Sequence, residues 1–291
     1  MNIHRHSATA NELGESALWD KRHNRLVWID ITNRKVFWMN SGDDRTYHIK
    51  TPEAPGCIVL AQGGGYLMAA GQTLYHLDDD FGNLETYCRI EKFHARTRLN
   101  DGKVDRAGGF VFGSCDLNEI EPLGSTFYLG TSGVIPLNDG FTVFNGPAFS
   151  PSGDRIYYTD SPTRQIITAS YQSDRGRIIP PYEVFATVPS EAGYPDGMTV
   201  DSEGHLWSAH WDGSQITRYR PDGNIDQEIQ VPVTRPTSLC FGGPELTTLF
   251  ITSASPESDR QRNQPDGIVD GDVIRLETIT CGIAEVAVAI G

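Results

Sequence analysis

Apolar and polar residues alternate along this chain in short runs, and turn-forming residues separate one run from the next. An alternation with a period of two residues is typical of β-strands that bury one face. The spacing of an amphipathic helix, with an apolar residue every three or four positions, is rare in this chain. The pattern therefore predicts an all-β protein made of many short strands.

Six segments repeat the same form, which is a polar or glycine-containing turn, an alternating run, a second turn and a second run. The first apolar residues of these segments follow one another at intervals of 40 to 50 residues, and they are Leu26, Tyr66, Phe110, Ile156, Leu206 and Leu249. A repeat of about 45 residues with several strands per unit is the period of propeller blades. We predict that residues 1–291 form one six-bladed β-propeller domain, and we rank a double-sheet sandwich second.

The two ends of the chain fit this ring. The segment Ile3–Ala8 precedes the first repeat, and we expect it to pair with the last blade, closing the ring and removing exposed strand edges. Its histidines, His4 and His6, would then lie on an outer strand with solvated side chains. The apolar tail Ile283–Ile290 also has the composition of a strand.

Polar residues recur about ten or eleven positions before each of the six apolar anchors. A propeller would place this position on the innermost strand of each blade, beside the axis. The residues found there, in chain order, are Glu15, Gly56, Asn100, Asn145, Asp196 and Ser238. Radial symmetry would bring Glu15, Asn100, Asn145 and Asp196 together at one end of the central channel.

Two carboxylates and two amides around a small space provide oxygen ligands for one divalent metal cation. Such ligands suit Ca²⁺, Mg²⁺ or Mn²⁺, and Zn²⁺ or Fe²⁺ can also use them. Without a cation, two carboxylates so close would repel each other, and one would take up a proton. Asn-Gly, Asp-Gly and Asn-Asp are also common turn pairs, so any one of these residues by itself indicates a turn. Four at one shared offset favour a metal site.

Composition narrows the range of partners. The chain has 38 acidic and 24 basic residues and a formal net charge of −14, which disfavours nucleic acid and anionic membranes as partners. Its five cysteines are scattered, without the paired spacing of a disulfide framework or a zinc-thiolate site. Residues 1–20 lack the apolar run of a signal peptide, and no stretch is long enough to span a membrane. We expect a cytoplasmic protein, a monomer or weak homo-oligomer, that acts on a small molecule.

Other catalytic groups receive less support from the sequence. There is no Gly-x-Ser-x-Gly motif, so a serine hydrolase is disfavoured. His210 follows an apolar run and could lie at the mouth of the cavity, but a surface or packed position is equally consistent with the sequence.

Five motifs, in order along the chain, resemble the regucalcin-like family of gluconolactonases and sugar lactonases. They are the sequences LGESALW from Leu13, RLNDGKVD from Arg98, FNGPAFSPSG from Phe144 followed by YYTD from Tyr157, PDGMTVDSEGHLW from Pro195, and CFGGP from Cys240. The resemblance extends from about Glu12 to Leu276. It implies a six-bladed propeller with a divalent cation at its axis.

The resemblance also implies roles for individual residues. The family's metal ligands match Glu15, Asn145 and Asp196, and the aspartate matching Asp196 is its proposed general base. Arg98 and Asn100 match residues that hold the substrate, so the resemblance makes Asn100 a substrate contact that could lie at the edge of the metal shell.

Two regions depart from the family pattern. A substrate-binding glutamate is expected after the first apolar run of the third repeat, where the register is loose. Glu119 is our choice there, and Glu121 is the alternative. Ser16 and Ala17 also replace the Gly-Pro that commonly follows the family's first glutamate.

The activity that follows is hydrolysis of a sugar lactone, an aldonolactone, to its aldonic acid. The cation would act as a Lewis acid, and Asp196 would activate water. Two alternatives remain open, since fold does not fix function. One is a non-catalytic propeller that binds a metal or ligand, and the other is a metal-dependent esterase or phosphotriesterase that uses the same residues.

Overall fold

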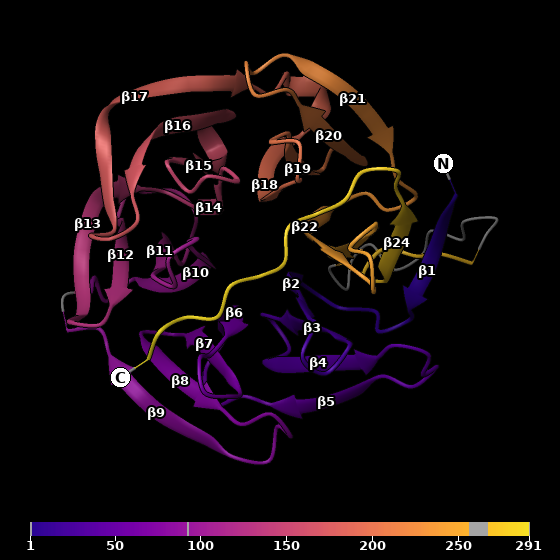
Figure 1. Ribbon diagram of the computed structural model, residues 1–291, viewed down its shortest axis with the longest axis horizontal. Coiled ribbons are helices and arrows are strands. Elements are labelled where there is room, and N and C mark those ends of the chain that lie inside the picture. The colour runs from indigo at the N-terminus through magenta and orange to yellow at the C-terminus, as the bar shows by residue number, and fades with distance from the viewer. Residues whose placement is uncertain (1, 92, 256–266, 291) are drawn as a thin grey trace.

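The protein is a six-bladed β-propeller (Figure 1), here a computed structural model that describes residues 2–91, 93–255 and 267–290. Within these residues, six sheets of four antiparallel strands surround a central axis. Each sheet is one blade, and the strand order runs from the axis outward. The predicted fold class is therefore confirmed.

The first three blades follow directly along the chain. Blade 1 contains β2 (Gly14–Asp20), β3 (Arg25–Asp30), β4 (Lys35–Asn40) and β5 (Tyr47–Lys50). Blade 2 contains β6 (Pro55–Leu60), β7 (Tyr66–Ala70), β8 (Thr73–Leu77) and β9 (Leu84–Arg89). Blade 3 contains β10 (Thr97–Val104), β11 (Phe110–Asp116), β12 (Gly124–Gly130) and β13 (Gly133–Phe141).

The other three blades complete the ring. Blade 4 contains β14 (Phe144–Phe149), β15 (Arg155–Asp160), β16 (Gln165–Gln172) and β17 (Arg177–Thr187). Blade 5 contains β18 (Tyr194–Val200), β19 (Leu206–Trp211), β20 (Gln215–Tyr219) and β21 (Ile225–Gln230). Blade 6 contains β22 (Pro236–Gly242), β23 (Thr248–Ser253), β24 (Val273–Glu277) and β1 (Ile3–Ser7). Two short 3-10 helices are present: η1 (Ser161–Thr163) joins β15 to β16 within blade 4, and η2 (Ser190–Ala192) joins blade 4 to blade 5.

The N-terminal strand closes the ring, as the sequence predicts. β1 pairs antiparallel with β24, with Ile3 opposite Leu276 and Ser7 opposite Val273. His4 is exposed on this strand, as expected. The expectation for His6 is wrong, because its ring packs edge-on against Phe250 with the centroids 4.7 Å apart.

The core lies between neighbouring blades, on the second strand of each. All six predicted apolar anchors are on these strands and have 0% of their surface exposed, and they are Leu26, Tyr66, Phe110, Ile156, Leu206 and Leu249. Side chains buried from both faces explain why these runs are almost continuously apolar. The outer strands β5, β9 and β17 have no fully buried residues, because each lies at the outer edge of its blade and pairs with only one other strand.

The innermost strand of each blade has an irregularity at the same place. Pairing between the first and second strands shifts near Glu15, Pro55, Leu99, Asn145, Pro195 and Pro236. A bulge breaks the ladder locally and turns the side chains of that strand in a new direction. In this ring, the new direction is toward the axis.

The C-terminal segment 278–290 crosses the axis of the ring (Figure 1, yellow). It does not form the strand that its composition suggests, because it meets several blades in turn and pairs with none of them over more than an isolated bridge. The nitrogen of Val288 donates to the oxygen of Leu60 in blade 2 at 2.7 Å, and the nitrogen of Ser202 after blade 5 donates to the oxygen of Cys281 at 2.9 Å. The segment therefore ties opposite sides of the ring together. No helix among the described residues has the length and apolarity that a membrane span requires.

Deletion of residues 1–7 is expected to destabilise the whole ring. Removing β1 exposes the edge of β24 and breaks the closure of blade 6. We expect the melting temperature to fall by roughly 5–10 °C, which corresponds to a few kcal/mol for a chain of this size. Differential scanning fluorimetry measures this, with the exposed substitution His4→Ala as a control that leaves the melting temperature unchanged. An unaltered melting temperature in the deletion would show that ring closure does not depend on β1.

Candidate active site

The six site residues predicted from the sequence line one cavity of about 330 Å³ at one end of the central channel. They come from four blades and lie mostly on the innermost strands, and they are Glu15, Arg98, Asn100, Glu119, Asn145 and Asp196. Apolar and aromatic side chains complete the wall, among them Leu13, Ile31, Val143, Tyr194 and Trp211. The ring thus brings together residues that are up to 181 positions apart in the sequence.

Glu15 is buried at the start of β2. Its Oε2 accepts a hydrogen bond from the nitrogen of Ser16 at 3.0 Å. Burial raises the pKa of Glu15 to about 8, and the Asp101 carboxylate adds to this rise, while the Ser16 N–H and the Arg98 charge oppose it. Without a cation, this side chain therefore holds its proton at neutral pH.

Asp196 is buried on β18 with only 5% of its surface exposed. Its Oδ1 has no hydrogen-bond partner among the described residues. Burial raises the pKa of Asp196 well above its ordinary range, and Glu15, Asp101 and Glu119 raise it further by their charges. A buried carboxylate oxygen without a partner is costly, and the cost is removed when a cation binds it.

Asn145, on β14, is held in a defined orientation by its neighbours. Its Oδ1 accepts a hydrogen bond from Asn100 Nδ2 at 2.8 Å, and its Nδ2 donates to Ser161 Oγ at 3.0 Å. Arg98 Nη1 in turn donates to Asn100 Oδ1 at 2.6 Å. An amide oxygen has two lone pairs, so Asn145 Oδ1 retains one for a second partner.

Glu119 and Glu121 are separated by the turn after β11. Glu119 has a left-handed backbone, with φ of 55°, and lines the cavity. Glu121 instead forms an exposed ion pair with Arg96, at 2.6 Å between Oε2 and Nη2. Of the two glutamates left open by the sequence, Glu119 is the one that lies at the cavity.

The other two innermost-strand positions, Gly56 and Ser238, have structural roles and are not candidate metal ligands. A Cβ on Gly56 would lie 2.3 Å from the oxygen of Leu99, so β6 and β10 can approach only when glycine is at this position. Ser238 Oγ accepts a hydrogen bond from the nitrogen of Ala17 at 3.3 Å and so joins blades 6 and 1.

Ser16 stands where the resemblance predicts glycine. Its backbone is left-handed, with φ of 51°, a conformation that glycine adopts without strain. The Ser16 hydroxyl accepts a hydrogen bond from the nitrogen of Ile58 at 2.9 Å in blade 2. This contact between blades offsets part of the backbone strain.

Asp101, which the sequence patterns did not single out, lines a second, smaller cavity and holds the backbone beside Asn145. Its Oδ2 accepts a hydrogen bond from the nitrogen of Gly146 at 2.7 Å, and its Oδ1 accepts one from Gly102 at 2.7 Å. It therefore holds the backbone beside Asn145, where Gly146 has a φ of 60°. The Asn-Asp-Gly sequence indicates a turn, whereas Asp101 lies within the bulged part of β10, and the local sequence carried no signal for this.

His210 does not line the cavity. It is buried on β19, its Nδ1 lies 3.1 Å from the oxygen of Ala192, and burial lowers its pKa to about 4. The sequence left open whether His210 lies at the mouth of the cavity or in a surface or packed position, and the structure places it in a packed position.

The residues present fit a divalent cation. Glu15, Asn145 and Asp196 offer hard oxygen ligands from three blades, and Asp196 Oδ1 has no hydrogen-bond partner within residues 2–91, 93–255 and 267–290. Two further acidic clusters lie outside this cavity, and they are Asp20–His23–Asp79 and Asp201–Glu203–His205. Arginines already pair with both, since Arg22 Nε lies 3.0 Å from Asp20 and Arg218 Nη2 lies 2.7 Å from Asp201. The cavity is therefore the better candidate metal site.

The chain is similar to known proteins over most of its length. Regucalcin of Xenopus laevis is 30% identical over 264 residues, covering 87% of this chain and 88% of its own length. Pentonolactonase XacC of Haloferax volcanii is 31% identical over 294 residues, covering 98% of this chain and 97% of its own. The solved structure of a luciferin-regenerating enzyme superposes with a TM-score of 0.90 at 25% identity and covers 99% of both chains.

The family model described as "SMP-30/Gluconolactonase/LRE-like region" matches residues 13–255, which is most of the propeller. The match begins at the motif that contains Glu15 and extends through blade 6 as far as the residues after β23. The chain therefore belongs to the SMP-30/gluconolactonase/LRE-like family, the regucalcin-like gluconolactonases.

Proposed function

We propose that this protein is a metal-dependent lactonase that hydrolyses a sugar lactone, an aldonolactone, to the aldonic acid. The observation that carries the proposal is the meeting of Glu15, Asn145 and Asp196 in one cavity, where Asp196 Oδ1 is buried and has no hydrogen-bond partner within the part of the chain that the structure describes. The pentonolactonase relative supports the same substrate class. The cavity of about 330 Å³ is of the size that suits a small sugar.

Glu15, Asn145 and Asp196 would hold the cation, whose identity among Ca²⁺, Zn²⁺, Mg²⁺, Mn²⁺ and Fe²⁺ the oxygen donors leave open. When bound, such a cation polarises the lactone carbonyl and lowers the pKa of bound water. The residues around it then position the substrate and move protons.

Asp196 is proposed as the general base. As the oxygen of water adds to the carbonyl carbon, the Asp196 carboxylate takes a proton from that water. The bond between the carbonyl carbon and the ring oxygen then breaks, and the ring oxygen takes the proton from Asp196 to become a hydroxyl group, which regenerates the carboxylate. The product is the open-chain hydroxy acid.

Arg98, Asn100 and Glu119 are proposed to bind the sugar hydroxyls. They supply donors and acceptors at the cavity wall, and polar pairing of this kind discriminates strongly between sugars. Tyr194 and Trp211 contribute to the apolar part of the wall, together with Leu13, Ile31 and Val143. Arg98 and Glu119 favour a polyhydroxylated substrate over the aryl esters or organophosphates of the esterase alternative.

A substrate panel on metal-free protein tests the proposal. We expect acid release from one or more of gluconolactone, galactonolactone, arabinolactone and xylonolactone when a divalent cation is added, and loss of that activity with chelator. No cation-dependent turnover on any of them would favour a non-catalytic binding propeller. Faster turnover of aryl esters or organophosphates would favour the esterase alternative.

Asp196→Ala is expected to lower turnover by at least about 10³-fold, even at saturating cation, because both a ligand and the base are lost. Steady-state kinetics over a range of cation concentrations measures this effect. Asp222→Ala, on an exposed turn, is the matched control and should leave the rate unchanged. A substantial residual rate in Asp196→Ala at saturating cation would remove this residue as the base.

Arg98→Ala is expected to raise KM about tenfold or more while the cation stays bound, because Arg98 is proposed to contact the substrate and not the metal. Arg96→Ala is a close control, since Arg96 pairs with the exposed Glu121 outside the cavity. Kinetics gives KM, and elemental analysis gives the bound cation. Loss of the cation from Arg98→Ala would contradict the assigned role.

The stability of the protein is expected to fall with rising pH when the cation is absent and to lose this dependence when the cation is bound. The folded, cation-free chain holds a proton on Glu15 up to pH 8, whereas the unfolded chain releases it near pH 4.5. Stability without cation therefore falls as the pH rises from about 4.5 to about 8, and the cation removes this loss by keeping Glu15 ionised. Thermal melts with cation and with chelator should show a larger stabilisation by the cation at pH 8 than at pH 6. The reverse order would show that Glu15 does not bind it.

A further inference from the structure

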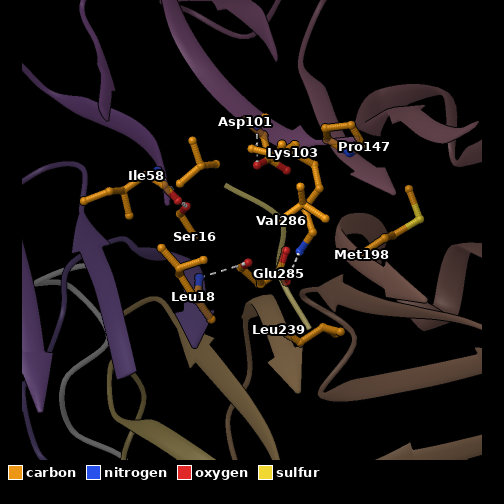
Figure 2. A pocket seen from close by; sticks show the side chains of 15 residues that line it. Ser16, Leu18, Ile58, Asp101, Lys103, Pro147, Met198, Leu239, Glu285 and Val286 are labelled. Carbon is orange, nitrogen blue, oxygen red and sulfur yellow. Dashed lines mark hydrogen bonds and ion pairs between the residues drawn. The ribbon is translucent and has the colours of Figure 1, made fainter. Parts of the chain in front are cut away.

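We call Glu15, Asn145 and Asp196 the cage. A largely covered ion pair lines a small cavity whose wall also contains Ser16, Pro147 and Met198, each one or two residues along the chain from a cage residue. Lys103 Nζ and Glu285 Oε1 are 2.7 Å apart, and their side chains are 18% and 9% exposed. Both line a small cavity of about 20 Å³ together with Asp101 (Figure 2). That volume has room for about one water molecule, so the pair is close to dry.

The two partners come from opposite ends of the sequence. Lys103 lies on β10, three residues after Asn100, and it points into the channel (Figure 2). Glu285 belongs to the C-terminal segment that crosses the axis. Backbone hydrogen bonds fix this segment on both sides of Glu285, at Cys281 and at Val288. Glu285 is thus held in place by the course of the chain.

Lys103 acts electrostatically on the residues beside the cage. Its positive charge lowers the pKa of Asp101, which otherwise rises through burial. Asp101 holds the backbone at Gly146, next to the proposed ligand Asn145. The positive charge of Lys103 attracts the Asp101 carboxylate, but the same charge repels a divalent cation in the cage.

The carboxylate of Glu285 offsets the repulsion between Lys103 and a bound cation. Charges interact strongly where water is excluded, and a buried charge without a counter-ion is costly. The Glu285 carboxylate neutralises Lys103 at 2.7 Å and draws its ammonium toward the C-terminal segment. The net charge that the cation meets is then set by the carboxylates of the cage.

We propose that Glu285 is a positioning residue for the metal site, supplied by the C-terminal segment, which holds Lys103 and cancels its charge so that the cage can take a divalent cation. This inference rests on the proposed cation site. It gives the segment that crosses the axis a role in cation affinity in addition to joining the blades.

Calorimetric titration of metal-stripped full-length protein with Ca²⁺ and with Mn²⁺ alone tests the inference without any substrate. Glu285→Gln keeps the shape of the side chain and removes its charge, so Kd for the cation should rise about tenfold. Removing both charges with Lys103→Met and Glu285→Gln together should return Kd to within about threefold of the starting protein. Val288→Ala loosens the same segment without changing any charge, so it should lower the melting temperature and leave Kd unchanged.

The outcomes separate the possible explanations. A Kd within twofold of the starting protein for Glu285→Gln, or an equal loss of affinity in Val288→Ala, overturns the inference and makes the segment a purely structural tie. If Glu285→Gln does not fold, the test uses the double variant Lys103→Met and Glu285→Gln. A Kd ten times weaker in the double variant than in the starting protein would overturn the charge argument. If the unmodified protein binds neither cation, the proposed metal site itself fails, and the inference fails with it.

Discussion

The pairing of β1 with β24 is the constraint on which the rest of the structure depends. Blade 6 takes three strands from the C-terminal part of the chain and one from the N-terminus, so the ring is complete only when the two ends meet. The candidate site draws on four different blades, and no pair of neighbouring blades contains all of it. Closure of the ring is therefore what converts six separate polar positions into one cavity.

The convergence of strands that forms the site also places carboxylates where their ionised form is energetically unfavourable. Radial convergence brings Glu15, Asp101 and Asp196 near one another, and loss of hydration raises the pKa of all three. Repulsion by neighbouring carboxylates raises the pKa of Glu15 and Asp196 further. Functional sites commonly accept such local conflicts, while the surrounding structure remains well satisfied. Here the surroundings are the apolar second strands, whose six anchors are fully buried.

The six innermost-strand positions also show how one repeat supports several roles. Each carries a bulge, so the backbone presents the side chain to the axis in every blade. The side chain then decides the outcome: Gly56 allows two strands to approach, Ser238 joins two blades, and Asp196 keeps a free oxygen. The C-terminal segment, which belongs to no repeat, adds a charge within the channel that the radial symmetry does not supply.

The sequence by itself determined the number of blades, the closing strand and the residues that meet at the axis. Those features follow from periodicity and from a shared offset, and a regular repeat converts both directly into positions in space. Tertiary structure alone decided the features that do not repeat. Glu119 rather than Glu121 lies at the cavity because of a left-handed turn, and Glu285 reaches Lys103 because a tail without regular pairing crosses the ring. Asp101 looked like a turn residue because local sequence cannot distinguish a turn from a bulged strand that a neighbouring blade holds in place.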